Sequence, residues 1–400
     1  MRVKETSESA VGDGRSQPAS ALTASLIARY YYPVGHVDLF ITERCNLRCP
    51  YCFVEGKKAR DIKLETAFKA IDFILKHSAE GASIGILFFG GEPFIRFDLM
   101  RSITLYGVAT AQRAGRSFYF TVTTNGTLLN EEKLAFCRDY GIKFLLSVDG
   151  GPESHNRNRK FTDGRGSFDT IAARIPLMKR YQPWLGARVT PTPETVGRLC
   201  EDVVNLFGLG INQFIVGPAT GVDWPAEAIG EYTEQMKRLV EVYADYQAKR
   251  YPFRLTQFED DLEENEKSKR FIWGCGAGRG RISVNVDGEI QGCGKIQGLN
   301  ELKGNLPFGN VDTGFTLEGL KNRALLCVDG LRWREDCARC ECSDECAGGC
   351  PATNFGCRGS IYLPNPQECE FVRRRRETKE HLRMLKGEKC DATVPATSAS

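Results

Sequence analysis

Residues 36–54 read HVDLFITERCNLRCPYCFV and place three cysteines directly after a strand-like run. The run at 36–42 is mostly apolar and short, which is typical of a buried strand. Cys45, Cys49 and Cys52 follow in C-x3-C-x2-C spacing. Three thiolates from one short loop can hold three irons of a [4Fe-4S] cube and leave the fourth iron without a protein ligand. Zinc or a purely structural cluster is the alternative for cysteine spacing alone.

The same strand-then-helix order recurs downstream of this loop. Amphipathic helical patterns, such as those at 63–78, 131–141 and 194–210, separate the strand-like runs. The runs are HVDLFIT (36–42), IGILFF (84–89), FYFTVTT (118–124), IKFLLSV (142–148), ARVTP (187–191) and NQFIVG (212–217). Six βα units predict an α/β fold with a parallel sheet, either an open doubly wound sheet or a partial barrel. In both folds, functional residues gather at the C-terminal ends of the strands.

The bulk composition favours a soluble protein that keeps its cysteines reduced. Hydrophobic residues make up 42% of the chain and charged residues 26%, and its apolar runs fall far short of a membrane span. The polar N-terminus lacks a signal peptide, so we expect a cytoplasmic protein with no membrane association. Because disulfides are rare in that compartment, the 16 cysteines point to metal binding. A net charge of +3 gives no indication of a nucleic-acid partner.

The cysteine loop resembles the signature of the radical S-adenosylmethionine (SAM) superfamily, C-x3-C-x2-C with an aromatic residue before the last cysteine. Tyr51 fills that place. The resemblance implies a partial (β/α)6 TIM-type barrel in which Cys45, Cys49 and Cys52 hold a [4Fe-4S] cluster. In the family, the open iron binds the amino and carboxylate groups of SAM. One electron then cleaves SAM to methionine and a 5′-deoxyadenosyl radical, which takes a hydrogen atom from the substrate.

Further motifs stand after the later strands in the order that the family shows. FFGGEPF (88–94) resembles the motif that receives the SAM ammonium, and TTNGTLL (123–129) and the segment from Ser147 to Arg159 match later SAM-binding segments. GGEP alone could be a turn, as could Asn125 and Asp149 beside glycine, and Arg188 could instead form a structural ion pair. The SAM contacts implied by the resemblance are Tyr51, Gly90, Gly91, Glu92, Pro93, Asn125, Ser147, Arg159 and Arg188.

A second cysteine group occupies DCARCECSDECAGGCP (336–351). By itself this stretch could form a zinc ribbon. Together with Cys275, Gly288, Cys293 and Cys369 its spacing resembles the SPASM domain of radical SAM enzymes, which carries two auxiliary [4Fe-4S] clusters. The resemblance assigns Cys275, Cys293 and Cys350 to auxiliary cluster I, and Cys337, Cys340, Cys346 and Cys369 to auxiliary cluster II. The candidates for a further ligand of cluster I are Cys327, Cys342 and Cys357, whereas Cys390 has no assigned role.

These patterns divide the chain into five predicted segments. The N-terminal tail (1–30) and the end of the chain are rich in small polar residues, which predicts disorder. The segments are a disordered tail (1–30), the radical SAM partial barrel (31–250), an acidic helical linker (251–270), the SPASM domain with two auxiliary clusters (271–370), and a basic helix with a disordered tail (371–400). With 44 residues before Cys45, the chain is expected to lack the N-terminal leader-binding domain of many peptide maturases.

The resemblance predicts an enzyme that modifies a peptide oxidatively by installing a crosslink, such as a thioether, with the auxiliary [4Fe-4S] clusters accepting an electron. The first alternative is an anaerobic sulfatase-maturating, formylglycine-forming enzyme, although Gly294 and Lys295 stand where that family has an aspartate after the second SPASM cysteine. A non-catalytic iron-sulfur electron carrier is the second alternative. Expected partners are a precursor peptide or protein, a separate leader-binding protein, and an electron donor such as flavodoxin or ferredoxin.

Overall fold

The structure is a computed structural model that describes most of the chain. The described residues are 31–259, 275–299, 302, 305–327, 335–343, 346 and 348–387. The predicted tail at 1–30, most of the predicted acidic linker and the predicted tail from 388 onward lie outside them.

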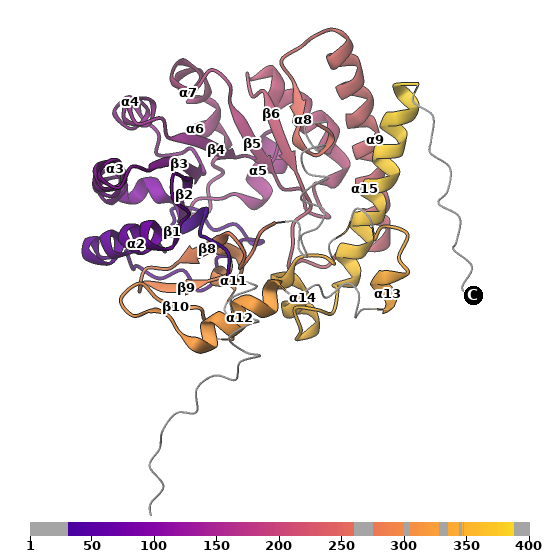
Figure 1. The fold of residues 1–400 in the computed structure, drawn as a ribbon. Helices are drawn as coiled ribbons and strands as arrows, with labels where there is room; N and C mark the ends of the chain where they lie inside the picture. The colour runs from indigo at the N-terminus through magenta and orange to yellow at the C-terminus, as the bar shows by residue number, and fades with distance from the viewer. Residues whose placement is uncertain are drawn as a thin grey trace, which may run out of the picture.

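The fold is built on one open, curved β-sheet (Figure 1). Its strands are β1 (His36–Thr42), β2 (Ser83–Gly90), β3 (Ser117–Thr124), β4 (Lys143–Ser147), β5 (Gly186–Val189), β6 (Gln213–Val216), β7 (Arg254–Leu255), β8 (Arg281–Val284), β9 (Glu289–Gln291), β10 (Gly309–Asn310) and β11 (Gly314–Phe315). Their order across the sheet is β11-β10-β9-β8-β1-β2-β3-β4-β5-β6-β7. β1 to β6 lie side by side and are parallel, which confirms the predicted α/β fold.

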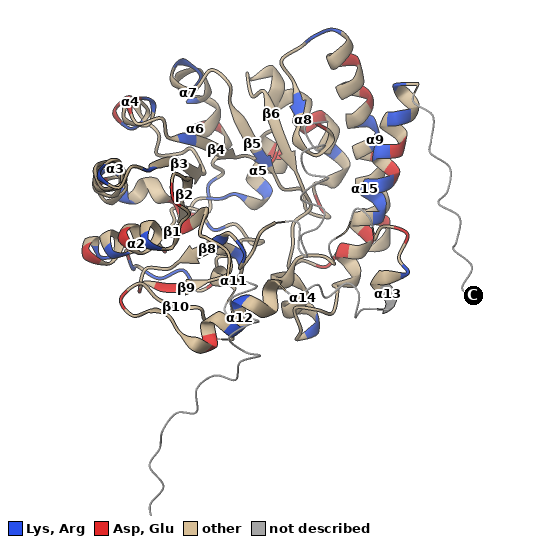
Figure 2. Cartoon of the chain, in the orientation of Figure 1, with Lys and Arg blue, Asp and Glu red and all other residues tan. Residues whose placement is uncertain are grey.

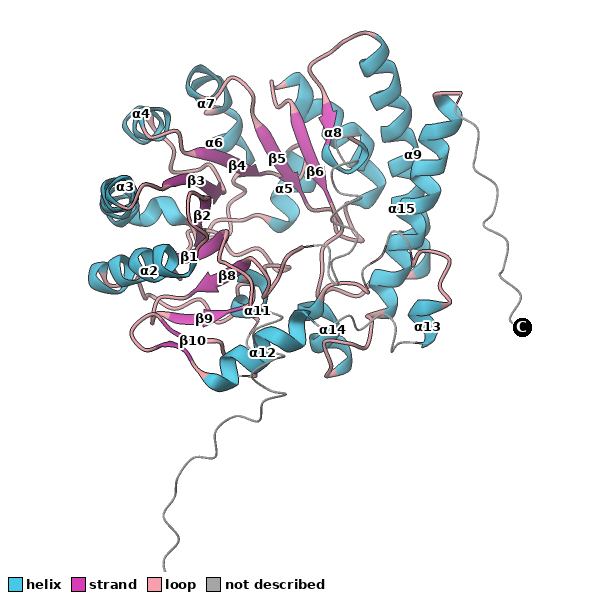
Figure 3. Ribbon diagram, in the orientation of Figure 1, coloured by secondary structure: helices cyan, strands magenta, loops and turns pink. Residues whose placement is uncertain are grey.

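Helices cover the outer side of this sheet, and Figure 3 shows α2, α3, α4 and α7 ranged along it. The helices are α2 (Leu64–His77), α3 (Phe97–Arg113), α4 (Glu131–Asp139), α5 (Pro152–Asn158), α6 (Phe168–Ala172), α7 (Ile175–Tyr181), α8 (Leu199–Gly208), α9 (Ala226–Ala248), α11 (Gly294–Gly298), α12 (Leu317–Cys327), α13 (Glu335–Ala338), α14 (Pro351–Arg358) and α15 (Pro366–Leu385). Local sequence sets several of their ends. The Asn130 side chain accepts a hydrogen bond from Lys133 N at 3.0 Å, and so caps α4.

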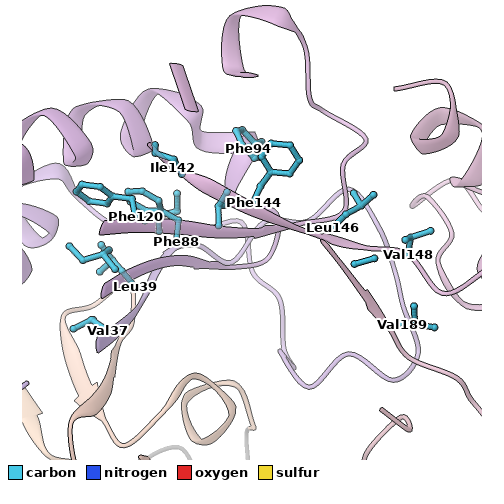
Figure 4. Packing of buried hydrophobic residues seen from close by; sticks show 14 of the residues in the cluster. Val37, Leu39, Phe88, Phe94, Phe120, Ile142, Phe144, Leu146, Val148 and Val189 are labelled. Carbon is cyan, nitrogen blue, oxygen red and sulfur yellow. The ribbon is translucent and has the colours of Figure 1, made fainter. Parts of the chain in front are cut away.

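The core lies between the sheet and the outer helices (Figure 4). On β1, Val37, Leu39 and Ile41 alternate toward the helices and are fully buried. Asp38 and Thr42 occupy the alternate positions and are buried as well. A strand buried on both faces is expected in a parallel sheet with a covered interior.

The sheet does not end where the second domain was predicted to begin. β8, at the start of the cysteine-rich part, pairs in parallel with β1, from His36 opposite Arg281 to Leu39 opposite Val284. The side chains of Arg281 and Asp38 join these strands through two hydrogen bonds, of 2.6 and 3.1 Å. The buried core also continues from β1 into β8 and β9. The division at residue 271 itself stays a prediction.

The C-terminal helix returns to the barrel. α15 packs along α9 (Figure 1), and its predicted basic run lies within it. Trp224, Tyr232 and Phe371 form an aromatic cluster with mutual ring-centroid distances of 5.1 to 6.1 Å. Gln367 also accepts a hydrogen bond from Trp224 N at 3.1 Å. These contacts fix α15 to the loop that follows β6.

None of the helices in the described ranges combines the length and apolarity that crossing a bilayer requires.

Replacing Asp38 with asparagine should destabilise the fold by about 3 kcal/mol, because Arg281 then loses its charge partner beside a buried strand. This value is at the low end for buried pairs because the Arg281 side chain is 36% exposed. Equilibrium unfolding in guanidinium chloride would measure the change. The matched control is D312N, which breaks the exposed Lys69–Asp312 pair between α2 and the cysteine-rich part and should cost less than about 0.5 kcal/mol. Equal losses in both variants would contradict the structural role of Asp38.

Candidate active site

The C-x3-C-x2-C loop leaves the C-terminal end of β1 with its three thiols directed to a common region. Cys45, Cys49 and Cys52 are all half-buried. Burial raises the pKa of Cys49 to about 11, and Arg159 and Cys52 lie close enough to influence it. The Lys57 ammonium group hydrogen-bonds Cys52. Burial favours the neutral form of Lys57, but the nearby Cys52, Cys45 and Cys49 outweigh this effect and raise the pKa of Lys57. Three soft sulfur donors beside one cation suit a thiolate-bound iron cluster.

Asp149, after β4, is the anchor of this loop. The Tyr51 hydroxyl donates to Asp149 Oδ2, and Arg159 donates to both carboxylate oxygens at 2.7 and 3.0 Å. Thr190 N, beyond β5, donates to Oδ1 at 3.0 Å. The Arg159 guanidinium also lies 5.5 Å from the centre of the Tyr51 ring. Asp149 is therefore a buried partner that orients two predicted SAM contacts, rather than only a turn residue.

The GGEP segment joins the cysteine loop to the end of β3. Gly91 N and Glu92 N donate to Thr42 O and Arg44 O at 2.8 and 2.7 Å. A Cβ at Gly90 or Gly91 would lie 2.1 or 2.0 Å from those same oxygens, and Gly90 has a φ of +121°. These glycines are thus required for close approach to the protein's own backbone.

Glu92 is buried and its carboxylate accepts three hydrogen bonds. Oε1 accepts from Thr124 Oγ1 at 2.8 Å and from Phe94 N at 3.2 Å, and Oε2 accepts from Asn125 N at 2.7 Å. Burial raises the pKa of Glu92, and the Asn125, Thr124 and Phe94 hydrogen bonds oppose that rise. Glu92 therefore organises the ends of β2 and β3, and Pro93 starts the short helix η1 (Pro93–Arg96) that follows it.

The Asn125 side chain faces the cysteine loop. Its amide donates to Asn46 Oδ1 at 2.9 Å, and its Oδ1 accepts from Thr127 Oγ1 at 2.7 Å. Asn46 in turn donates to Thr127 Oγ1 at 2.8 Å. The three side chains form a closed ring of hydrogen bonds that positions the loop between Cys45 and Cys49.

Ser147 is the last residue of β4 and Arg188 the second-to-last of β5, and the two are partners in the register of these strands. Arg188 makes a long hydrogen bond of 3.5 Å to Gly217 O. Its guanidinium therefore lies toward the end of β6, near Asp149, Arg159 and Tyr51. The structural ion pair considered for Arg188 does not occur among the described residues.

The distal cysteines fall into two groups. In the first, burial and then the charges of Cys350 and Cys275 raise the pKa of Cys293 to about 12. The pKa of Cys275 is likewise raised, first by burial and also by the nearby Cys350. In the second, burial and then Cys346 and Cys337 raise the pKa of Cys369 to about 11, with Cys340 also contributing. Cys350 thus lies with two cysteines that are distant in sequence rather than with its near neighbours. No three His, Cys, Asp or Glu side chains of the described residues surround a point at single-ion distances.

The three candidates for a further ligand of cluster I differ in their surroundings. Cys342 is buried beside Cys340 of the second group. Cys327 is buried near Arg323 and Arg279, and Cys357 is exposed on α14. Cys390 lies outside the described residues.

Sequence reasoning missed three residues that shape the site. Lys57, Asn46 and the anchoring role of Asp149 all depend on contacts across 5 to 98 positions of chain. Asn46 could have been suspected because it lies between the first two cysteines. Nothing in the local pattern marks Lys57.

Comparison with known sequences agrees with this site. Residues 39–199 match the family model "Radical SAM superfamily". An uncharacterized protein of Methanocaldococcus jannaschii, MJ0907, is 27% identical over 68% of this chain and 88% of its own. A cysteine-type anaerobic sulfatase-maturating enzyme of Clostridium novyi is 29% identical over 35% of this chain and 39% of its own.

Solved structures agree in fold over most of the chain. Native anSMEcpe with bound AdoMet and Cp18Cys peptide has a TM-score of 0.69 and 20% identity, covering 89% of this chain and 99% of its own. Streptococcus suis SuiB bound to its precursor peptide SuiA has a TM-score of 0.56 and 16% identity, covering 90% and 82%. The cysteine loop after the first strand of the open α/β sheet lies within residues 39–199, the part of the chain that matches the radical SAM model, and a domain of this family implies SAM and a [4Fe-4S] cluster as cofactors.

Proposed function

We propose that this chain is a cytoplasmic radical SAM enzyme that oxidatively modifies a peptide or protein, installing a crosslink such as a thioether. Its cysteine-rich part would be a SPASM domain with two auxiliary [4Fe-4S] clusters. The observation that carries the proposal is the grouping of Cys350 with Cys275 and Cys293, and of Cys369 with Cys346, Cys337 and Cys340. A zinc ribbon would instead unite Cys350 with its near neighbours around one ion.

In this proposal Cys45, Cys49 and Cys52 hold the first cluster, and SAM lies against the GGEP segment, Asn125, Ser147, Arg159 and Arg188. When bound, SAM and this cluster supply a carbon radical after one-electron reduction. The protein's part is positioning. Asp149 orients Tyr51 and Arg159, and Glu92 holds the ends of β2 and β3 together.

Cys293, which would help to hold auxiliary cluster I, precedes a short helix that contacts the first cysteine loop. Glu55 N, three residues after Cys52, donates to Gly298 O at 3.0 Å, and Gly298 ends the short helix α11 that Cys293 precedes. Phe53 also packs where a Cβ of Gly298 would lie, at 2.9 Å. This adjacency suits transfer of the electron that the substrate releases when it is oxidised. The peptides bound in the two solved structures, anSMEcpe and SuiB, favour a peptide substrate.

Anaerobic sulfatase maturation is the second candidate, favoured by the relative from Clostridium novyi. The surroundings of Gly294 count against it. Gly294 N donates to Asp38 Oδ2 at 2.8 Å, and a Cβ at 294 would lie 3.0 Å from that oxygen. An aspartate at this position would therefore place a second carboxylate against Asp38. Incubation with a peptide carrying a sulfatase Cys or Ser motif would test the candidate, since mass spectrometry detects the formylglycine.

The iron content of the protein and of cysteine variants should test which cysteines hold each proposed cluster. Anaerobically reconstituted protein should hold about twelve irons per chain, as three [4Fe-4S] clusters require. C350A and C369A should each lose about four irons by removing a ligand of a different cluster, and C200A, in helix α8, should lose none. About four irons in the unsubstituted protein would refute the auxiliary clusters.

Glu92→Gln should reduce kcat/KM for SAM cleavage about 10- to 100-fold. The glutamine NH2 group would point at one of the three groups that now donate to Glu92, so that this hydrogen bond would be lost. An unsatisfied buried donor costs about 1–3 kcal/mol. Formation of 5′-deoxyadenosine with dithionite as reductant measures the effect. The control is E132Q on the exposed surface of α4, which should cleave SAM at the normal rate. No cleavage by the unsubstituted protein with its clusters present would instead favour an electron carrier.

A further inference from the structure

A cavity of about 290 Å³ lies at the C-terminal ends of β5 and β6 and is bounded on the other side by α9 and α15. Arg188 and Val216 line it from the strands, Tyr232 from α9, and Phe371 and Arg375 from α15. Figure 3 shows β5 and β6 directed toward α15. The cavity is therefore formed jointly by the barrel and the C-terminal helix.

The cavity lies between the two reactive regions of the proposed enzyme. On one side, Arg188 is close enough to Tyr51 and Asp149 for them to influence its pKa. On the other, Glu368 Oε2, in the cavity wall, accepts from Cys350 N at 3.2 Å. Lys295, two residues after Cys293, donates to Thr220 in the same wall at 2.9 Å. A molecule bound here would contact the neighbourhoods of both the SAM loop and the first distal thiol group.

Arg188 has a guanidinium without a carboxylate partner among the described residues. Its hydrogen bond to Gly217 O is long, at 3.5 Å, and the Asp149 oxygens are occupied by Arg159, Tyr51 and Thr190. The side chain is half-buried, so water compensates its charge incompletely. Burying a cation is costly unless an anion compensates it.

Arg375 differs from the other arginines of its run on α15. Arg373 pairs with Glu370, Arg374 with Glu370 and Glu377, and Arg376 with Glu380. In the part of the chain that the structure describes, Arg375 has no such partner, and it lines the cavity instead. Figure 2 shows the closely spaced charges along this helix.

Both guanidinium groups lie near the phenol of Tyr232. Tyr232 is buried, and its pKa is raised to about 12 by burial, with Arg188 and Arg375 both close enough to oppose the rise. Glu368 is the acidic residue of the lining, and one of its oxygens holds Cys350 N. The lining thus keeps an excess of positive charge.

We propose that this cavity binds a carboxylate of the substrate at Arg375, with the Tyr232 hydroxyl as a further donor and with Arg188, which the proposed function assigns to SAM, bounding the cavity on the barrel side. Arginine is suited to this because its planar fork matches carboxylate geometry. The substrate class is then a peptide with an acidic side chain next to the modified residue. Calling the ligand a substrate rests on the proposed function; the binding site itself rests on the cavity.

Three capped probe peptides test the site on the reconstituted holoenzyme with SAM present: Ac-Gly-Glu-Gly-NH2, Ac-Gly-Gln-Gly-NH2 and Ac-Gly-Gln-Gly-OH. Saturation-transfer NMR gives their dissociation constants. The glutamate peptide should bind about tenfold more tightly than the fully neutral peptide. R375Q should reduce that preference to less than about twofold, and R383Q, exposed on the same helix, should keep it. Tighter binding of the peptide with the free C-terminus would identify a terminal carboxylate as the ligand.

Equal binding of all three peptides, or an undiminished preference in R375Q, would overturn the proposal. SAM cleavage is measured on the same samples. R375Q should retain 5′-deoxyadenosine formation, since Arg375 is not among the proposed SAM contacts. Absent cleavage in every sample would refute the proposed function while leaving the peptide preference as an independent result on the cavity.

Discussion

The pairing of β1 on both of its edges is the constraint on which the site depends. β1 pairs with β2 on one side and β8 on the other, both in parallel. Its C-terminal end carries the C-x3-C-x2-C loop, while Cys275 precedes β8 and Cys293 follows β9, at the two ends of the β8–β9 hairpin. One strand therefore sets the relative position of two cysteine groups that lie about 240 residues apart in sequence. The Asp38–Arg281 pair holds this junction.

A second constraint concerns charge. The cysteine loop would be a concentration of negative charge once its thiols ionise, and the structure surrounds it with Lys57 and Arg159. Arg159 is itself balanced by Asp149, which also accepts from Tyr51. A buried charge network of this kind is costly unless each group is paired. The arrangement fixes these side-chain orientations through hydrogen bonds within the protein, which is what catalysis by positioning requires.

Much of the fold and part of the site could be predicted from sequence. The six strand-like runs were recognisable because parallel strands are continuous apolar segments, and all six form adjacent parallel strands. The motifs GGEP and TTNG were correctly expected at strand ends. The reason for the glycines was different: Gly90 and Gly91 make room for Thr42 and Arg44 carbonyls rather than for a ligand alone. The assigned ligands and SAM contacts stay predictions.

The sequence by itself determined the six strand-like runs along the chain, the position of the cysteine loop after the first of them and the spacing of the distal cysteines, because apolar runs and cysteine spacing are local features. Only the tertiary structure decided that β8 extends the barrel sheet, that Asp149 and Lys57 surround the cysteine loop, and that α15 closes a cavity over Arg188. Such contacts join segments that are far apart in the chain. These contacts are stabilised by the burial of apolar surface and by charge pairing between segments that meet only in the folded chain. No local sequence pattern encodes them.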